Sequence, residues 1–492
     1  MAARAVREAG GDTGGSRPVT RRLMLGGGVL AASVLLGAGL IVPAAAEPGV
    51  ATAPKVSAEP GPATVPGFTQ RVSHGPGGAQ PDAPSRGGGV SDDGRYVLFS
   101  SAASGLVPGD TNGVEDAFVR DTWTGRVQRV SVGDHGKQLT TPCPGASLSG
   151  DGRYVAFGSD EPGLVADDTD DRSDVFVFDR VTGRTVRVTP GAEGGGFDPA
   201  ISRDGRYIAF SSVRKVDLPG GERGRQNVYV LDRRTGVTRL ASITRDGAVP
   251  DQPSRSATIS ADGQRVAFIS RTFGLADDPG DPDDPGDATE DAGEGAGASI
   301  LKPTLYPIYV YDLRTGRVQR GSEGPDRLLG SPSGRITPDG RHVAFIGWEV
   351  DTRPGAPSGG LLPHRYVAYV HDLETGKTVQ MSRTTTGEDG NGDDTEILTS
   401  GDGRWVYFAS TSDGLVPGDT DAKRDVFRRD LRTGHTETLV DLGPNSPEEA
   451  DTVTGADALG TSVVVTGPDG ILGYPGDTNG YSDVFVRRVL PW

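Results

Sequence analysis

The chain has 492 residues and a formal net charge of −17, and hydrophobic residues make up 34% of it. The acidic balance excludes an ordinary nucleic-acid binder, because phosphate contacts need clustered Lys and Arg. The 75 glycines and 36 prolines argue against long helices, and the single cysteine, Cys143, excludes an internal disulfide. We expect Cys143 to be an ordinary buried residue.

The first 46 residues have the pattern of an export signal. Arg21 and Arg22 directly precede an apolar stretch over residues 23–42, and the alanines at 44–46 provide a cleavage site. We therefore predict a twin-arginine signal peptide over residues 1–46. The alternative is an uncleaved membrane anchor, since the apolar stretch is long enough to cross a bilayer.

Cleavage of this signal predicts a mature chain that begins near Glu47 and does not span a membrane. The protein would then be secreted or belong to the cell envelope. Residues 47–66 are rich in Pro, Ala and Gly and predict a flexible linker.

A repeated block of sequence fills residues 67–492. In its second copy, an Asp-Gly pair at 151–152 precedes the apolar run 154–157, a loop leads to the run 174–178, and a Thr-Gly turn leads to a last run at 185–189. Short apolar runs bounded by turns are typical of strands covered on both faces, and glycine suits the turns because it tolerates positive φ. The Asp-Gly pairs stand at Asp93-Gly94, Asp151-Gly152, Asp204-Gly205, Asp262-Gly263, Asp339-Gly340 and Asp402-Gly403.

A short strand before each Asp-Gly pair gives the block four antiparallel strands, and such sheets repeated around an axis are propeller blades. A seventh copy lacks its last strand, whereas residues 68–73 match the last strand of the first copy at 127–131 and have no strands before them. We predict an all-β fold, a seven-bladed β-propeller over residues 67–492, whose ring closes when the N-terminal strand completes the last blade. Residues 276–298, which are mostly Asp, Glu, Gly, Pro and Ala, predict a solvated insertion in the fourth copy.

The repeat units at 149–157 and 174–183 resemble the Pro-Asp-type, WD40-like repeats of the TolB-like β-propeller family. The segment Thr337-Pro338-Asp339-Gly340-Arg341 is closest to the family form, and the resemblance covers roughly residues 68–490. The resemblance implies the propeller fold. The sequence departs from TolB in having no separate α/β domain between Glu47 and Phe68, so the resemblance does not imply the cellular role of TolB.

The sequence contains no Gly-x-Ser-x-Gly elbow, His-Glu-x-x-His, Cys-x-x-Cys or Walker A motif, and we assign no catalytic residue. Some TolB-like propellers resemble pectate-fragment lyases, which hold a metal with histidines on the propeller face. Convergence of His342, His364 or His371 is therefore the alternative to scattered surface histidines. The six histidines are His74, His135, His342, His364, His371 and His435.

Four copies carry an acidic loop before their third strand, with oxygen donors at its first, third and seventh positions. Such donors suit Ca²⁺, and calcium is the only cofactor that we expect. The alternative is that these side chains bond their own loop backbone as Asx-turns. The candidate metal ligands are Asp110, Asn112 and Asp116 in blade one, Asp168, Asp170 and Asp174 in blade two, Asp419, Asp421 and Asp425 in blade six, and Asp477, Asn479 and Asp483 in blade seven. In a closed ring these four blades form one continuous arc across the junction of the chain ends.

We expect an exported, non-enzymatic, monomeric propeller that binds a protein or a cell-surface glycan through the loops at its ends. The alternative is a metal-assisted polysaccharide lyase or hydrolase with its site at the central channel. Polar groups from several blades that converge at one end of the channel would favour the enzyme. Unclustered loops would favour the binding module.

Overall fold

The computed structural model describes residues 64–143, 145–169, 171–189, 195–213, 225–272, 274–276, 306–325, 328–351, 364–420, 422–441, 452–467 and 478–489. The chain divides into two compact units, Met1–Ala58 and Glu59–Trp492, and all described residues lie in the second. The predicted signal peptide, nearly all of the linker and nearly all of the insertion lie outside the described residues. Within the described part, no helix has the length and hydropathy of a membrane span.

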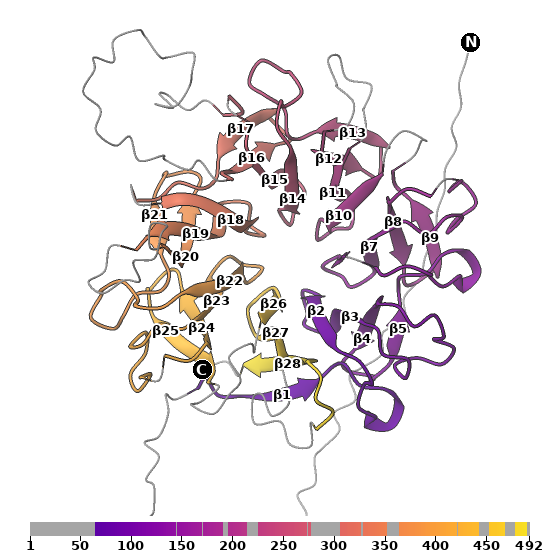
Figure 1. Ribbon diagram of the computed structural model, residues 1–492, viewed down its shortest axis with the longest axis horizontal. Coiled ribbons are helices and arrows are strands. Elements are labelled where there is room, and N and C mark those ends of the chain that lie inside the picture. The colour runs from indigo at the N-terminus through magenta and orange to yellow at the C-terminus, as the bar shows by residue number, and fades with distance from the viewer. Residues whose placement is uncertain are drawn as a thin grey trace, which may run out of the picture. The chain divides into compact units, whose positions relative to one another are not determined.

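Seven four-stranded antiparallel sheets form a ring around a central channel (Figure 1), which confirms the predicted seven-bladed β-propeller. Each of blades one to six is a meander of four consecutive strands, numbered outward from the channel. Helix is almost absent from the described residues, where two 3₁₀ turns occur, η1 (Pro76–Gly78) and η2 (Asp134–Gly136).

The strand bounds follow the predicted repeat. Blades one to three consist of β2 (Ser85–Val90), β3 (Tyr96–Ser101), β4 (Asp116–Asp121) and β5 (Val127–Arg129); of β6 (Ala146–Leu148), β7 (Tyr154–Ser159), β8 (Asp174–Asp179) and β9 (Arg184–Arg187); and of β10 (Gly196–Ile201), β11 (Tyr207–Ser212), β12 (Asn227–Asp232) and β13 (Val237–Leu240). Blades four to six consist of β14 (Ser254–Ile259), β15 (Arg265–Ser270), β16 (Ile308–Asp312) and β17 (Arg317–Arg320); of β18 (Leu328–Ile336), β19 (His342–Val350), β20 (His364–Asp372) and β21 (Thr378–Gln380); and of β22 (Asp394–Thr399), β23 (Trp405–Ser410), β24 (Asp425–Asp430) and β25 (Thr436–Val440). Blade seven consists of β26 (Thr452–Ala456), β27 (Ser462–Gly467), β28 (Asp483–Val489) and β1 (Gly67–Arg71).

The ring is closed as predicted, by the N-terminal strand. Strand β1 pairs antiparallel with β28, with Gly67 opposite Val489 and Arg71 opposite Phe485. Just after β1, the Val72 N–H donates to the Val484 carbonyl at 2.7 Å, and the buried Ser73 hydroxyl donates to the Asp483 carboxylate. The chain ends therefore share one sheet, which removes the free edges of an open ring.

The second and third strands of each blade form the core. Their apolar side chains are buried between neighbouring blades, and facing aromatic pairs stack within a blade, as Phe99 and Phe118 do with ring centroids 5.5 Å apart. Strands covered on both faces need continuous apolar runs. A modest hydrophobic content therefore suffices, because it is concentrated in these runs.

The Ser-x-Asp-Gly-Arg segment, which blades one, two, three and six share, has a structural role. In blade two, the Ser149 hydroxyl donates to Asp151 at 2.6 Å, and the Arg153 guanidinium donates to both oxygens of Asp179 at 3.0 and 2.7 Å. This guanidinium lowers the pKa of Asp179 to about 2. Gly152 has a φ of +69°, and a Cβ on it would collide with the ring of Tyr96 in blade one. The motif thus fixes both the turn and the contact between blades.

Candidate functional site

A cavity of about 710 Å³ occupies one end of the central channel. All seven blades line it, mainly through the middle of their innermost strands. The Asp-Gly turns follow these strands and lie at the other end of the channel. The polar residues that line the cavity include Arg86 and Glu115 of blade one, Asp198 of blade three, Ser256 of blade four, Arg335 of blade five and Glu396 of blade six.

Three of these residues occupy β-bulges in the innermost strands. The strand register shifts between Phe197 and Ala200 in blade three, and equivalent shifts occur in blades four and six. The bulges hold Asp198, Ser256 and Glu396 at φ values of 52°, 57° and 52°. A positive φ is unfavourable for residues other than glycine, and bulges next to functional sites re-aim side chains. The fold therefore directs three polar side chains from three blades into one cavity at a conformational cost.

Most charged side chains of this cavity have no partner among the described residues. Glu115 accepts a hydrogen bond from the Ser100 hydroxyl, but no described residue forms a hydrogen bond or ion pair with the side chain of Arg86, Asp198, Arg335 or Glu396. Asp198 is exposed to solvent within the cavity, but the surrounding protein reduces the hydration of its carboxylate. This desolvation raises the pKa of Asp198. A strained carboxylate with a raised pKa in a cavity has the properties of a functional residue.

The opposite end of the channel is bridged by side chains. Arg203, in the Asp-Gly turn of blade three, forms an ion pair with Asp92 in the turn of blade one. A Cβ on Gly401 of blade six would collide with the Arg203 guanidinium and with the backbone of Ala458 in blade seven. Arg203 therefore reaches turns on several blades, and the cavity opens away from them.

The acidic loop of blade one gathers around an arginine. Arg129 lies 2.8 Å from Asp110 and 3.4 Å from Asp116, the Ser131 hydroxyl donates to Asp116 at 2.6 Å, and the Asn112 amide donates to Asp116 at 2.7 Å. Burial raises the pKa of Asp110, although Arg129 opposes the effect. The structure therefore brings these three predicted ligands together, with a guanidinium already among them.

The third-strand aspartates of blades two and seven have the same kind of partner. Arg187 lies 2.5 Å from Asp174 and Arg71 lies 3.6 Å from Asp483. The sequence signal for this pairing is the Arg-Val-Ser or Arg-Val-Thr segment at 71–73, 129–131 and 187–189.

The remaining predicted ligands are partly described. The Asp168 carboxylate accepts from the Leu164 N–H at 3.0 Å, the Asn479 amide donates to Asp483 at 3.2 Å, and Asp419 and Asp425 are buried. Asp170, Asp421 and Asp477 lie outside the described residues. Among the residues that are described, no cluster of three or more His, Cys, Asp or Glu has the arrangement of a metal site. Calcium binding stays a prediction.

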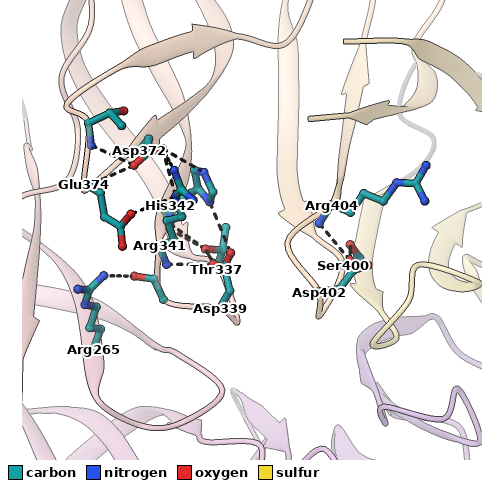
Figure 2. Close-up of polar contacts among 12 residues, drawn as sticks. Arg265, Thr337, Asp339, Arg341, His342, Asp372, Glu374, Ser400, Asp402 and Arg404 are labelled. Carbon is teal, nitrogen blue, oxygen red and sulfur yellow. Dashed lines mark hydrogen bonds and ion pairs between the residues drawn. The ribbon is translucent and has the colours of Figure 1, made fainter. Parts of the chain in front are cut away.

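The three histidines of the alternative hypothesis do not converge. Strands β19 and β20 pair with His342 opposite Asp372 at one end and Val350 opposite His364 at the other, so His342 and His364 lie at opposite ends of the hairpin. His342 lies 3.7 Å from both Asp339 and Asp372 (Figure 2). Burial lowers the pKa of His371, whose ring lies 2.9 Å from the Thr378 hydroxyl.

Cys143 is buried, as expected, and lines the channel cavity. Burial raises the pKa of its thiol to about 12. The thiolate is the nucleophilic form, so this thiol is unreactive at neutral pH.

No family model and no curated protein matches the chain. Among solved structures, it is similar to an oligogalacturonate lyase in complex with manganese, at 12% identity and a TM-score of 0.49 over 87% of this chain and 95% of that chain. It is similar to the oligogalacturonate lyase of Vibrio parahaemolyticus at 11% identity and a TM-score of 0.49, over 88% and 99% of the two chains. It is similar to TolB of Acinetobacter baumannii at 17% identity and a TM-score of 0.35, over 65% of this chain and 58% of that chain. At such identities the similarity concerns the fold alone, and the class of this protein, a seven-bladed β-propeller, follows from its own strand order.

Proposed function

We propose that the protein is an exported binding protein that takes up a polar ligand, a segment of a protein or of a glycan, in the open end of its central channel. The observation that supports this is the set of four charged side chains, Arg86, Asp198, Arg335 and Glu396, which face one cavity without partners among the described residues. A polar ligand would supply those partners. The arginines suit carboxylate or carbonyl oxygens, and the carboxylates suit hydroxyl or amino groups.

The strain at Asp198 and Glu396 favours a ligand-binding role over a structural one. A left-handed backbone costs about 1 kcal/mol or more for such residues and persists where the surrounding structure enforces it. Neither side chain stabilises the fold through a described contact in return. The conformation is therefore explained by what the side chains present to the cavity.

The experiment uses the mature chain, residues 47–492, as bait against proteins of the native secretome and against an array of charged and neutral oligosaccharides. The double variant Asp198→Asn with Arg335→Ala should lose the captured ligand. The matched control Asp246→Asn removes an exposed carboxylate outside the cavity and should keep it. Equal capture by the cavity variant and the control would contradict the proposal.

A metal-assisted polysaccharide lyase or hydrolase is the second candidate, and the convergence of polar groups from several blades favours it. In that reaction Asp198 would be the candidate general acid or base, because its pKa is raised. Incubation of bound oligosaccharides with the protein and divalent metal would then release new chain ends. Release that is lost in Asp198→Asn and kept in Asp246→Asn would establish the enzyme, whereas binding without release would establish the binding protein.

A further inference from the structure

Backbone hydrogen bonds join neighbouring Asp-Gly turns around the channel. At each such boundary, an N–H in the turn of one blade donates to a carbonyl in the turn of the next blade. The bonds run from Asp92 to Gly150 at 2.8 Å, from Gly150 to Arg203 at 2.9 Å, from Arg203 to Ala261 at 3.0 Å, from Ala261 to Pro338 at 2.8 Å, from Asp402 to Ala458 at 2.7 Å and from Ala458 to Asp92 at 3.1 Å. This set of bonds, here called the turn ring, ties six of the seven blade boundaries.

The boundary between blades five and six lacks this bond among the described residues. Pro338 stands at the donor position of blade five, and proline has no N–H to donate. Figure 2 shows the consequence: contacts lie within the Asp339 turn and within the Asp402 turn, and Arg265 of blade four reaches the Gly340 carbonyl at 2.6 Å. The turn of blade five is thus tied to blade four and not to blade six.

The aromatic ring that fills the turn side of several boundaries is also absent here, as it is between blades four and five and between blades seven and one. The rings of Tyr96, Tyr154 and Tyr207 lie where a Cβ on the turn glycine of the next blade would stand. Blade five has His342 at the same position, and Gly403 of blade six faces the Asp339 carboxylate instead of a ring. No tyrosine therefore fills the turn side of this boundary.

The other end of the same boundary is well tied. The Ala368 N–H of blade five donates to the buried Asp394 carboxylate of blade six at 2.8 Å. Arg365, paired with Glu349 within blade five, donates to the Gly390 carbonyl at 2.7 Å. Hydrogen bonds among the described residues therefore join blades five and six far from the Asp-Gly turns, but none joins the two blades beside these turns.

We propose that the ring opens between blades five and six on the side of the Asp-Gly turns, turning about the Asp394 and Arg365 contacts. Opening carries Gly401 away from Arg203 and widens the bridged end of the channel. The other six boundaries stay closed because the turn ring holds them.

Two equivalent alanines allow a matched test. Ala344 in β19 is buried at the boundary with blade six, and Ala267 in β15 has the same place in its blade and is buried at the boundary with blade five. In a Cys143→Ala background, the Ala344→Cys thiol should react with a thiol reagent about tenfold faster than the Ala267→Cys thiol under native conditions, since one hydrogen bond changes an opening equilibrium by up to about that factor.

Substitution of Pro338 and Ala261 tests whether the turn-ring hydrogen bond controls opening of a boundary. Pro338→Ala supplies the missing N–H and should slow labelling of the Ala344→Cys thiol about threefold or more. Ala261→Pro removes a bond of the turn ring and should speed labelling of the Ala267→Cys thiol by a similar factor. The backbone of the repeat accepts proline at this position, as Pro338 shows.

Equal labelling of the two thiols, or rates that do not respond to the turn substitutions, would overturn the proposal. If a cysteine variant fails to fold, thermal unfolding of the turn variants decides instead. Pro338→Ala should then raise the melting temperature and Ala261→Pro should lower it. Unchanged melting of both variants would show that no boundary depends on the turn ring.

Discussion

The buried carboxylate of Asp394 makes the stability of the ring depend on pH. Burial raises its pKa to about 6, against the opposing effect of hydrogen bonds from Ser382, Ser410 and the Ala368 N–H. Because the folded pKa is higher than the unfolded value of 3.8, folding favours the protonated form. The stabilising contribution is therefore complete below pH 3.8 and is lost as the pH rises through about 6. A rise of this size corresponds to about 3 kcal/mol.

Asp394→Asn removes the charge and keeps the shape. The side-chain carbonyl can still accept from the Ala368 N–H, and the amide can donate to the serine hydroxyls. We expect the variant to be more stable than the parent by up to about 3 kcal/mol at pH 8, with a difference that shrinks toward zero near pH 4. Blades one and four have Ser85 and Ser254 at the equivalent position, so the blade does not need a carboxylate there.

The assay is urea unfolding of the mature chain, followed by tryptophan fluorescence, from pH 4.5 to 8. The control is Asp179→Asn, because Arg153 lowers the pKa of Asp179 to about 2. That variant should be less stable than the parent across the whole range, since a lowered pKa stabilises the protein above the unfolded pKa. A gain at Asp394→Asn that does not depend on pH, or a loss of stability above pH 6, would refute the reasoning.

Three further predictions concern the chain ends and the acidic loops. Deletion of residues 47–75 removes β1 together with the Ser73–Asp483 contact, and should abolish cooperative thermal unfolding or cause aggregation; an unchanged transition would contradict ring closure through β1. Mass spectrometry of the exported protein should find an N-terminus near Glu47, and a product that still carries residues 23–42 would disprove cleavage. The double variant Arg21→Lys with Arg22→Lys should block export. Millimolar Ca²⁺ should raise the melting temperature, because each occupied site adds about 2.7 kcal/mol to the free energy of unfolding at a hundredfold excess over Kd. The double variant Asp110→Ala with Asp477→Ala should reduce this rise. Melting that responds neither to calcium nor to a chelator would leave pairing with Arg129 and Arg71 as the role of these loops.

The sequence was sufficient to predict the fold because the repeated residues are those that form the turns and strands of a blade. Ser149, Asp151, Gly152 and Arg153 recur with few exceptions in blades one to six because each makes a local contact, whereas blade seven keeps only the glycine. Ring closure was predictable because residues 68–73 copy a last strand that otherwise has no sheet to join.

The arrangement of the acidic loops could not be predicted in the same way. Oxygen donors at close spacing suit a cation, but the spacing does not reveal the guanidinium of Arg129, which comes from the following strand. The strand register places Arg129 opposite Phe118, two residues after Asp116. From this position the Arg129 guanidinium reaches the Asp116 carboxylate. The partner of a loop residue in a sheet is thus set by pairing and not by proximity in sequence.

The cavity residues were missed for the opposite reason, since they do not repeat. The bulge position holds Asp198 in blade three, Ser256 in blade four and Glu396 in blade six, and no pattern in the sequence links three such different side chains. Ring closure alone brings them to one cavity. In a repeat protein the blades serve as an internal comparison: a position kept in every blade serves the fold, and a polar position that differs between blades, is strained and faces a shared cavity is free to serve a ligand. By that argument Asp198 and Glu396 are the first residues to substitute in a search for function, ahead of the more numerous acidic residues of the loops.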